Sequence, residues 1–197
     1  MNTPNKLTLF RIFLIPIIVF IYLFPSIFTS INIPIYYLCN SSITLLNIIV
    51  VVLFAIASIT DFIDGNLARK YHLITTFGKF MDPIADKLLV NTLLILLTAS
   101  GRIHVLVCII MIARDTIVDA IRLLASQNNV VLAASPLGKA KTFTQMFAIV
   151  FLLLNNIPFS AIALPVDMIL IYSATIISFI SGFDYVYKNI NFIMESK

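Results

Sequence analysis

"DFIDGNLARKYHLITTFGKFMDPIADK", residues 61–87, lies between two apolar segments that are each long enough to cross a membrane. It holds four of the nine acidic residues of this 197-residue chain, at Asp61, Asp64, Asp82 and Asp86. A carboxylate at membrane depth costs about 2.5 to 3.5 kcal/mol, and clustered carboxylates also repel one another. These aspartates therefore require positive charge nearby, from metal ions or from basic side chains.

The composition around this stretch is that of an integral membrane protein. The chain is 60% hydrophobic and 11% charged, with a mean hydropathy of +1.05, which is far from the values of soluble domains. Long apolar runs indicate helices, because a membrane barrel would instead show short alternating segments. The sequence predicts an all-α transmembrane fold, a six-helix bundle forming a single domain over residues 1–197. The six apolar segments span approximately residues 7–29, 42–66, 83–100, 103–125, 137–157 and 161–187.

The basic residues predict the orientation of this bundle. Of the thirteen lysines and arginines, all but Arg102 lie near the two chain ends or near the joints between helices two and three and helices four and five. Positive residues favour the cytoplasmic side, so we expect both termini and residues 61–87 there. The net charge of +4 on this face favours anionic lipid headgroups or phosphorylated substrates, and no aromatic-rich basic tract indicates nucleic acid.

The aspartate spacing predicts a metal site. Asp61 and Asp64 are three residues apart and Asp82 and Asp86 four apart, so each pair lies on one side of its own helix and the pairs can face each other. Carboxylate oxygens without cysteine or convergent histidine suit Mg²⁺ or Mn²⁺, and four of them suit two ions in a phosphoryl-transfer site. The alternative is that the aspartates form interfacial ion pairs with neighbouring basic residues. Those residues are Arg69, Lys70, Lys79 and Lys87.

The same stretch resembles a family motif. It contains "D61-x-x-D64-G65-x-x-A68-R69", eight residues, then "G78-x-x-x-D82-x-x-x-D86", and all eight fixed positions match the motif of the CDP-alcohol phosphotransferases. These enzymes join an alcohol to the phosphatidyl group of a CDP-linked lipid, in a six-helix fold with the motif across helices two and three. The resemblance implies a homodimeric enzyme of the bacterial cytoplasmic membrane that uses CDP-diacylglycerol among membrane lipids.

The resemblance also implies CDP-lipid contacts at residues inside the motif. These residues are Gly65, Ala68, Arg69, Thr75 and Gly78. Read without the family, the small residues fit either close approach of a nucleotide or helix packing, and Arg69 fits either a phosphate contact or a side chain extending to the interface. Thr75 also fits a helix cap or a loop hydroxyl.

The amino terminus carries a less specific match. "PNKLTLFR", residues 4–11, resembles the Pro-Asn-x-x-Thr-x-x-Arg opening of bacterial members, in which Asn5 and Thr8 would help to hold the CDP group. Either residue also fits a helix cap before the first span.

The later helices carry the basic residues that would bind the acceptor alcohol. Arg114, Arg122, Lys139 and Lys141 lie near the expected cytoplasmic ends of helices four and five. An acceptor with its own phosphate needs such positive charge when it enters a carboxylate-rich site. The alternative is the general positive bias of cytoplasmic ends.

This region resembles the phosphatidylglycerophosphate synthase branch of the family, through "R114-D115", "R122-L-L-A" and "L137-G-K-A-K-T142". The branch usually has glutamate where Asp115 stands and a small or hydroxyl residue where Asp119 stands. The resemblance implies transfer of the phosphatidyl group from CDP-diacylglycerol to sn-glycerol 3-phosphate, giving phosphatidylglycerol phosphate and CMP, with Asp86 as general base.

Two alternatives stay open at this point. The first is a family member with another acceptor, such as inositol phosphate, serine or phosphatidylglycerol. The second is a cation channel or transporter whose acidic cluster binds a permeating ion.

Overall fold

The computed structural model describes the backbone of residues 3–70, 76–128, 130, 132, 135–190 and 194, and the side chains of residues 5–61, 81–128, 130, 132, 135–190 and 194. Its elements, in chain order, are α1 (Thr3–Ile27), β1 (Ile35–Leu38), β2 (Ser41–Thr44), α2 (Leu45–Lys70), α3 (Thr76–Ala99), α4 (Val105–Gln127), α5 (Pro136–Leu153), the 3-10 turn η1 (Phe159–Ile162) and α6 (Val166–Lys188).

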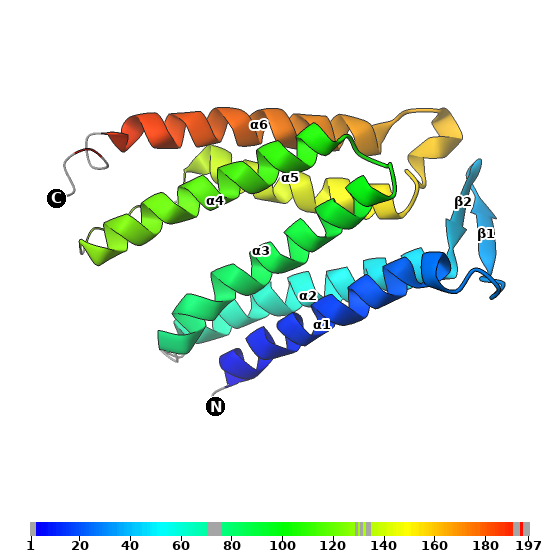
Figure 1. Cartoon of the computed structure of the whole chain (residues 1–197), viewed down its shortest axis with the longest axis horizontal. Helices are drawn as coiled ribbons and strands as arrows, with labels where there is room; N and C mark the ends of the chain where they lie inside the picture. The colour runs from blue at the N-terminus through cyan, green and yellow to red at the C-terminus, as the bar shows by residue number, and fades with distance from the viewer. Residues whose placement is uncertain are drawn as a thin grey trace.

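The six long helices run along the long axis of the molecule and alternate in direction (Figure 1). Both chain ends lie at one end of the bundle, where α2 also leads into α3 and α4 into α5. The β1–β2 hairpin lies at the opposite end. The predicted bundle of six helices is therefore confirmed, with the small hairpin added to it, and we call the end that carries the termini the terminal end.

The hairpin was not predicted. Cys39 and Asn40 form its two-residue turn with φ angles of 50° and 60°, the positive values that match the twist of paired strands. Because residues 41–44 pair with β1, the second helix begins at Leu45 instead of residue 42. It then continues to Lys70, and α3 already begins at Thr76, so Gly78 lies inside a helix rather than in the predicted joint.

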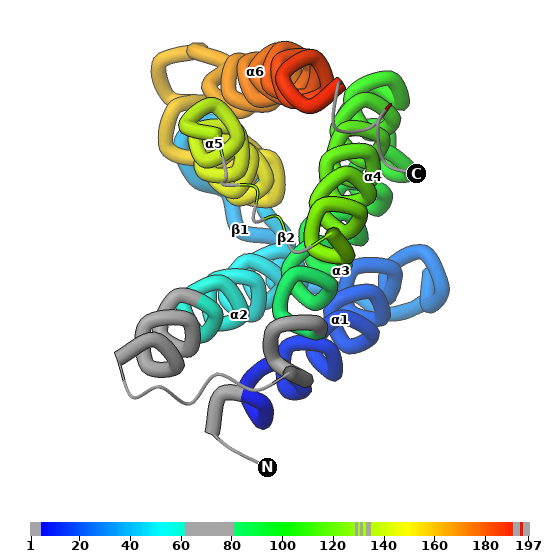
Figure 2. Tube along the Cα trace, turned by 90° about the vertical axis from the view of Figure 1, so that its left-hand side faces the viewer, coloured from blue at the N-terminus to red at the C-terminus, as the bar shows by residue number. Residues whose placement is uncertain are grey.

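Helix α3 lies at the centre of the bundle. Seen end-on, it lies between α1 and α2 on one side and α4 on the other, with α5 and α6 side by side beyond (Figure 2). Leu93, Leu94 and Leu97 of α3 are fully buried, and Phe54 of α2 and Ile149 of α5 belong to the same apolar core. This packing fixes the relative positions of α2, α3, α4 and α5 toward the terminal end, where the ionisable side chains gather.

Two helices of the described chain are long and apolar enough to cross a membrane, α1 over Asn5–Ile27 and α6 over Val166–Lys188. Large apolar side chains on their outer faces, such as Phe13, Phe179 and Phe183, are exposed in the isolated chain. Such faces suit contact with lipid. Helices α2, α3, α4 and α5 supply the charged residues of the cavity described next.

Candidate active site

A cavity of about 780 Å³ opens between α2, α3, α4 and α5 in the terminal half of the bundle. Acidic residues come mainly from α2 and α3 and basic residues mainly from α4 and α5. The charged lining residues are Asp61, Asp82, Asp86, Lys87, Arg114, Asp115, Asp119, Arg122, Lys139 and Lys141. The structure thus brings three of the four motif aspartates and all four predicted acceptor-binding cations to one cavity.

The acidic wall is organised around Arg11 of α1. This side chain is only 1% exposed, and its NH1 donates hydrogen bonds to Asp61, at 2.5 Å, and to Asp86. Its NH2 lies 3.8 Å from an oxygen of Asp82. Arg11 was not among the predicted site residues, although it is the arginine that ends the Pro-Asn-x-x-Thr-x-x-Arg match.

The three described aspartates offer only carboxylate oxygens, which is the donor chemistry that Mg²⁺ and Mn²⁺ prefer. Asp61 comes from α2, while Asp82 and Asp86 come from successive turns of α3. Among the residues whose side chains are described, no three such ligands are arranged around a common point as a preformed metal site. Asp64, the fourth predicted ligand, lies outside the described side chains. The three carboxylates are therefore chemically suited to bind a divalent ion. In this structure Arg11 supplies the positive charge between them.

The opposite wall is organised around Asp115 of α4, which is buried. Its carboxylate accepts a hydrogen bond from Lys141 Nζ at 2.6 Å and another from Arg114 NH1 at 3.0 Å. Asp115 therefore pairs both with its neighbour Arg114 and with Lys141.

Asp119 pairs with Lys87 of α3 across the cavity. The α4 and α5 wall carries four cations and two aspartates, hence a net charge of +2 (4 − 2). That charge would balance a phosphate dianion, so Asp119 does not remove the positive character of this wall.

Helix α6 positions the arginines of this wall from outside the cavity. Ser181 Oγ accepts a hydrogen bond from Arg114 NH2 at 3.0 Å, and Tyr185 OH accepts one from Arg122 Nε at 3.2 Å. Gly182 leaves the space that the Arg114 stem occupies, because a Cβ there would lie 2.7 Å from Arg114 Cγ. Ser181, Gly182 and Tyr185 were not predicted as site residues, although polar and small residues three or four apart on one face of an apolar helix are a signal of such a role.

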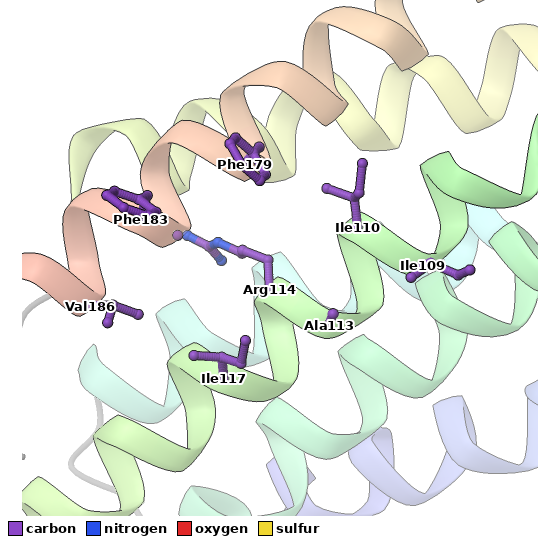
Figure 3. A pocket seen from close by; sticks show the side chains of 9 residues that line it. Ile109, Ile110, Ala113, Arg114, Ile117, Phe179, Phe183 and Val186 are labelled. Carbon is purple, nitrogen blue, oxygen red and sulfur yellow. The ribbon is translucent and has the colours of Figure 1, made fainter.

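Arg114 also borders a second hollow. An apolar groove of about 300 Å³ lies between α4 and α6, and Arg114 reaches across it from α4 toward α6, between Phe179 and Phe183 (Figure 3). Arg114 therefore forms part of the wall of both the groove and the charged cavity.

The predicted CDP-lipid contacts are only partly described. Thr8 is buried and donates a hydrogen bond to Asp82 at 2.5 Å, and Asn5 is buried one turn earlier on α1; neither lines the cavity. Their CDP-binding role stays a prediction. The side chains of the remaining predicted contacts lie outside the described residues. These are Gly65, Ala68, Arg69, Thr75 and Gly78.

Comparison with known proteins identifies the family of this chain. A family model described as CDP-alcohol phosphatidyltransferase matches residues 1–180. The chain belongs to this family. As a CDP-alcohol phosphatidyltransferase it is an enzyme, so the channel or transporter alternative is set aside.

Its relatives include proteins named CDP-diacylglycerol--glycerol-3-phosphate 3-phosphatidyltransferase. The protein of that name from Bacillus subtilis (strain 168) is 40% identical over 188 residues, which cover 95% of each chain. Its namesake from Rickettsia typhi is 38% identical over 185 residues, covering 93% of this phosphatidyltransferase and 94% of the relative. The namesake from Mycoplasma genitalium is 41% identical over 148 residues, covering 75% and 62% respectively.

Proposed function

We propose that this protein transfers the phosphatidyl group of CDP-diacylglycerol to sn-glycerol 3-phosphate, giving phosphatidylglycerol phosphate and CMP. The observation that carries the proposal is the two-sided cavity, in which a carboxylate wall faces a wall of net charge +2. The first wall suits a metal-assisted pyrophosphate reaction, and the second suits an acceptor that carries a phosphate. The names of the relatives point to the same donor and acceptor.

The reaction is an in-line substitution at the lipid-side phosphorus of the donor. Asp86 accepts the proton of the primary hydroxyl of the acceptor. The hydroxyl oxygen then forms a bond to that phosphorus while the bond to the CMP oxygen breaks, and CMP leaves with the electron pair. Arg122 and Lys139 bind the acceptor phosphate, together with Arg114 and Lys141, which Asp115 holds in place. Their combined effect is to aim the hydroxyl at the phosphorus.

Mg²⁺ or Mn²⁺ fits the carboxylate set, with Asp61, Asp64, Asp82 and Asp86 as ligands and two ions per site. When bound, the ions supply positive charge that offsets the pyrophosphate and the departing CMP.

The membrane arrangement follows from the bundle. We expect all six helices to cross the bacterial cytoplasmic membrane with both termini and the cavity on the cytoplasmic side, because the basic residues cluster at the terminal end. The homodimer implied by the family resemblance belongs to the same proposal.

A panel of acceptors tests the proposal directly. The purified enzyme, incubated in detergent micelles with labelled CDP-diacylglycerol and one alcohol at a time, is expected to release CMP with sn-glycerol 3-phosphate. Inositol phosphate, serine and phosphatidylglycerol are expected to give little product, because serine and phosphatidylglycerol have no terminal phosphate for the positive wall and inositol is bulkier. Product with serine alone would refute the assignment.

Removing the Tyr185 hydroxyl is expected to weaken acceptor binding. Tyr185→Phe keeps the ring beneath Arg122, 5.4 Å from the guanidinium carbon, but removes the oxygen that accepts from Arg122 Nε. The KM for glycerol 3-phosphate should rise about fivefold, as for one lost hydrogen bond that acts through another residue. Steady-state kinetics at saturating CDP-diacylglycerol measure the change, and the KM for the lipid should stay the same. Tyr172→Phe, an exposed position on the same helix, is the control.

A further inference from the structure

Gln145 of α5 is a buried amide that forms part of the wall of the charged cavity. Its side chain is 1% exposed, and its Nε2 has no hydrogen-bond partner among the described residues. It lies one helical turn after Lys141, whose ammonium group is bonded to Asp115. The Gln145 donor is therefore unsatisfied next to a neighbour whose charge is paired.

An unpaired buried donor is costly. Leaving such a group unsatisfied costs about 1 to 3 kcal/mol, and nearly all buried polar groups in proteins have a partner. A glutamine buried in the wall of a substrate cavity is explained most simply if the substrate itself supplies the missing hydrogen-bond partner.

The depth of Gln145 indicates which part of the acceptor it meets. The starts of α3 and α5 and the end of α4 all face the terminal end, and the end of α4 extends beyond the other two (Figure 1). Gln145 lies nine positions into α5, and Asp86 lies ten positions into α3. Lys139 is only three positions into α5, and Arg122 is five positions from the end of α4.

At 1.5 Å per residue, Gln145 lies about 9 Å deeper along α5 than Lys139, and Asp86 of α3 lines the same cavity. An acceptor whose phosphate is bound by Lys139 therefore extends its hydroxyl groups toward Gln145. A neutral amide suits a neutral hydroxyl, whereas the phosphate already has four basic side chains.

We infer that Gln145 determines acceptor specificity by donating a hydrogen bond from Nε2 to the secondary hydroxyl of the acceptor, while Asp86 takes the proton of the primary hydroxyl. This inference rests on the proposed function. It assigns Gln145 a contact with the substrate that selects three-carbon phosphorylated alcohols bearing a hydroxyl on the middle carbon.

The test pairs two enzymes with two acceptors. Gln145→Met keeps the length of the side chain and removes the donor, and 3-hydroxypropyl phosphate is glycerol 3-phosphate without the secondary hydroxyl. The wild type is expected to prefer glycerol 3-phosphate over this analogue by about tenfold in kcat/KM, as for one hydrogen bond with an otherwise unpaired partner. The variant should lose about tenfold with glycerol 3-phosphate, mainly through KM, and almost nothing with the analogue.

Matched variants keep the result interpretable. Gln145→Leu removes the amide donor with little change in volume, and it should show the same loss of discrimination if the methionine variant does not fold. Asn91→Leu is the control, because the Asn91 side chain also has an unpartnered buried atom but does not line the cavity. It should leave the ratio of kcat/KM values for the two acceptors unchanged.

Equal losses with both acceptors, or no loss with either, would overturn the assignment of Gln145 and leave the proposed function standing. A wild type that makes no product from glycerol 3-phosphate would overturn both.

Discussion

The Asp86→Asn variant is expected to lose about 10³-fold or more in kcat for phosphatidyl transfer while it still binds CDP-diacylglycerol. Asparagine keeps the shape of the side chain, and its oxygen can still accept from Arg11, so the acidic wall should remain folded. It cannot take a proton from the acceptor, and general-base catalysis contributes about 10² to 10⁴ in rate. Loss of one carboxylate ligand adds to the defect.

CMP release and thermal stabilisation by CDP-diacylglycerol measure the two properties separately. A titration with Mg²⁺ or Mn²⁺ distinguishes the base from the ligand role, because excess metal restores a weakened metal site but not a missing base. Asp184→Asn is the matched control, since that aspartate pairs with Lys188 on α6, away from the cavity. Wild-type turnover by Asp86→Asn at saturating metal would disprove the base assignment.

The Arg11→Met variant is expected to be strongly destabilised when no divalent metal is present. Arg11 is buried and is the nearest positive charge to Asp61, Asp82 and Asp86 among the described residues. Removing one partner of a buried ion pair costs about 3 to 5 kcal/mol, and the lower value applies because each aspartate side chain is at least 34% exposed. For a chain of this size the melting temperature should fall on the order of 10 °C.

Metal should rescue this variant. Divalent cations and Arg11 neutralise the same carboxylates, so Mg²⁺ or Mn²⁺ should raise the melting temperature of Arg11→Met more than that of the wild type. Melting curves in EDTA and in metal measure the difference, and Arg11→Lys, which keeps the charge, should show a smaller effect. Identical melting temperatures of wild type and Arg11→Met in EDTA would contradict the role of Arg11 as counter-ion.

The sequence was informative wherever chemistry follows from regular spacing along a helix. Apolar segments of membrane length predicted six helices, and the intervals between the aspartates predicted that Asp61, Asp82 and Asp86 would meet. The basic residues of helices four and five were expected to face this cluster, and the cavity contains both groups.

The parts that sequence did not reveal depend on contacts between helices. Nothing in the spacing of Asp115 indicates that it bonds Lys141, 26 residues later, as well as its neighbour Arg114. The support that Ser181 and Tyr185 give to the arginines depends on how α6 packs against α4. The hairpin turn was missed because Cys39-Asn40 differs from the glycine-containing pairs that usually indicate such turns.

The ionisable residues of the cavity all lie toward one end of the bundle, and this position has a consequence for the membrane as a whole. In the membrane arrangement that we propose, donor lipid enters and product lipid leaves at the depth of a single leaflet. Each turnover then converts one anionic lipid, CDP-diacylglycerol, into another, phosphatidylglycerol phosphate, within that leaflet. The opposite leaflet can receive the product only by a separate flipping step.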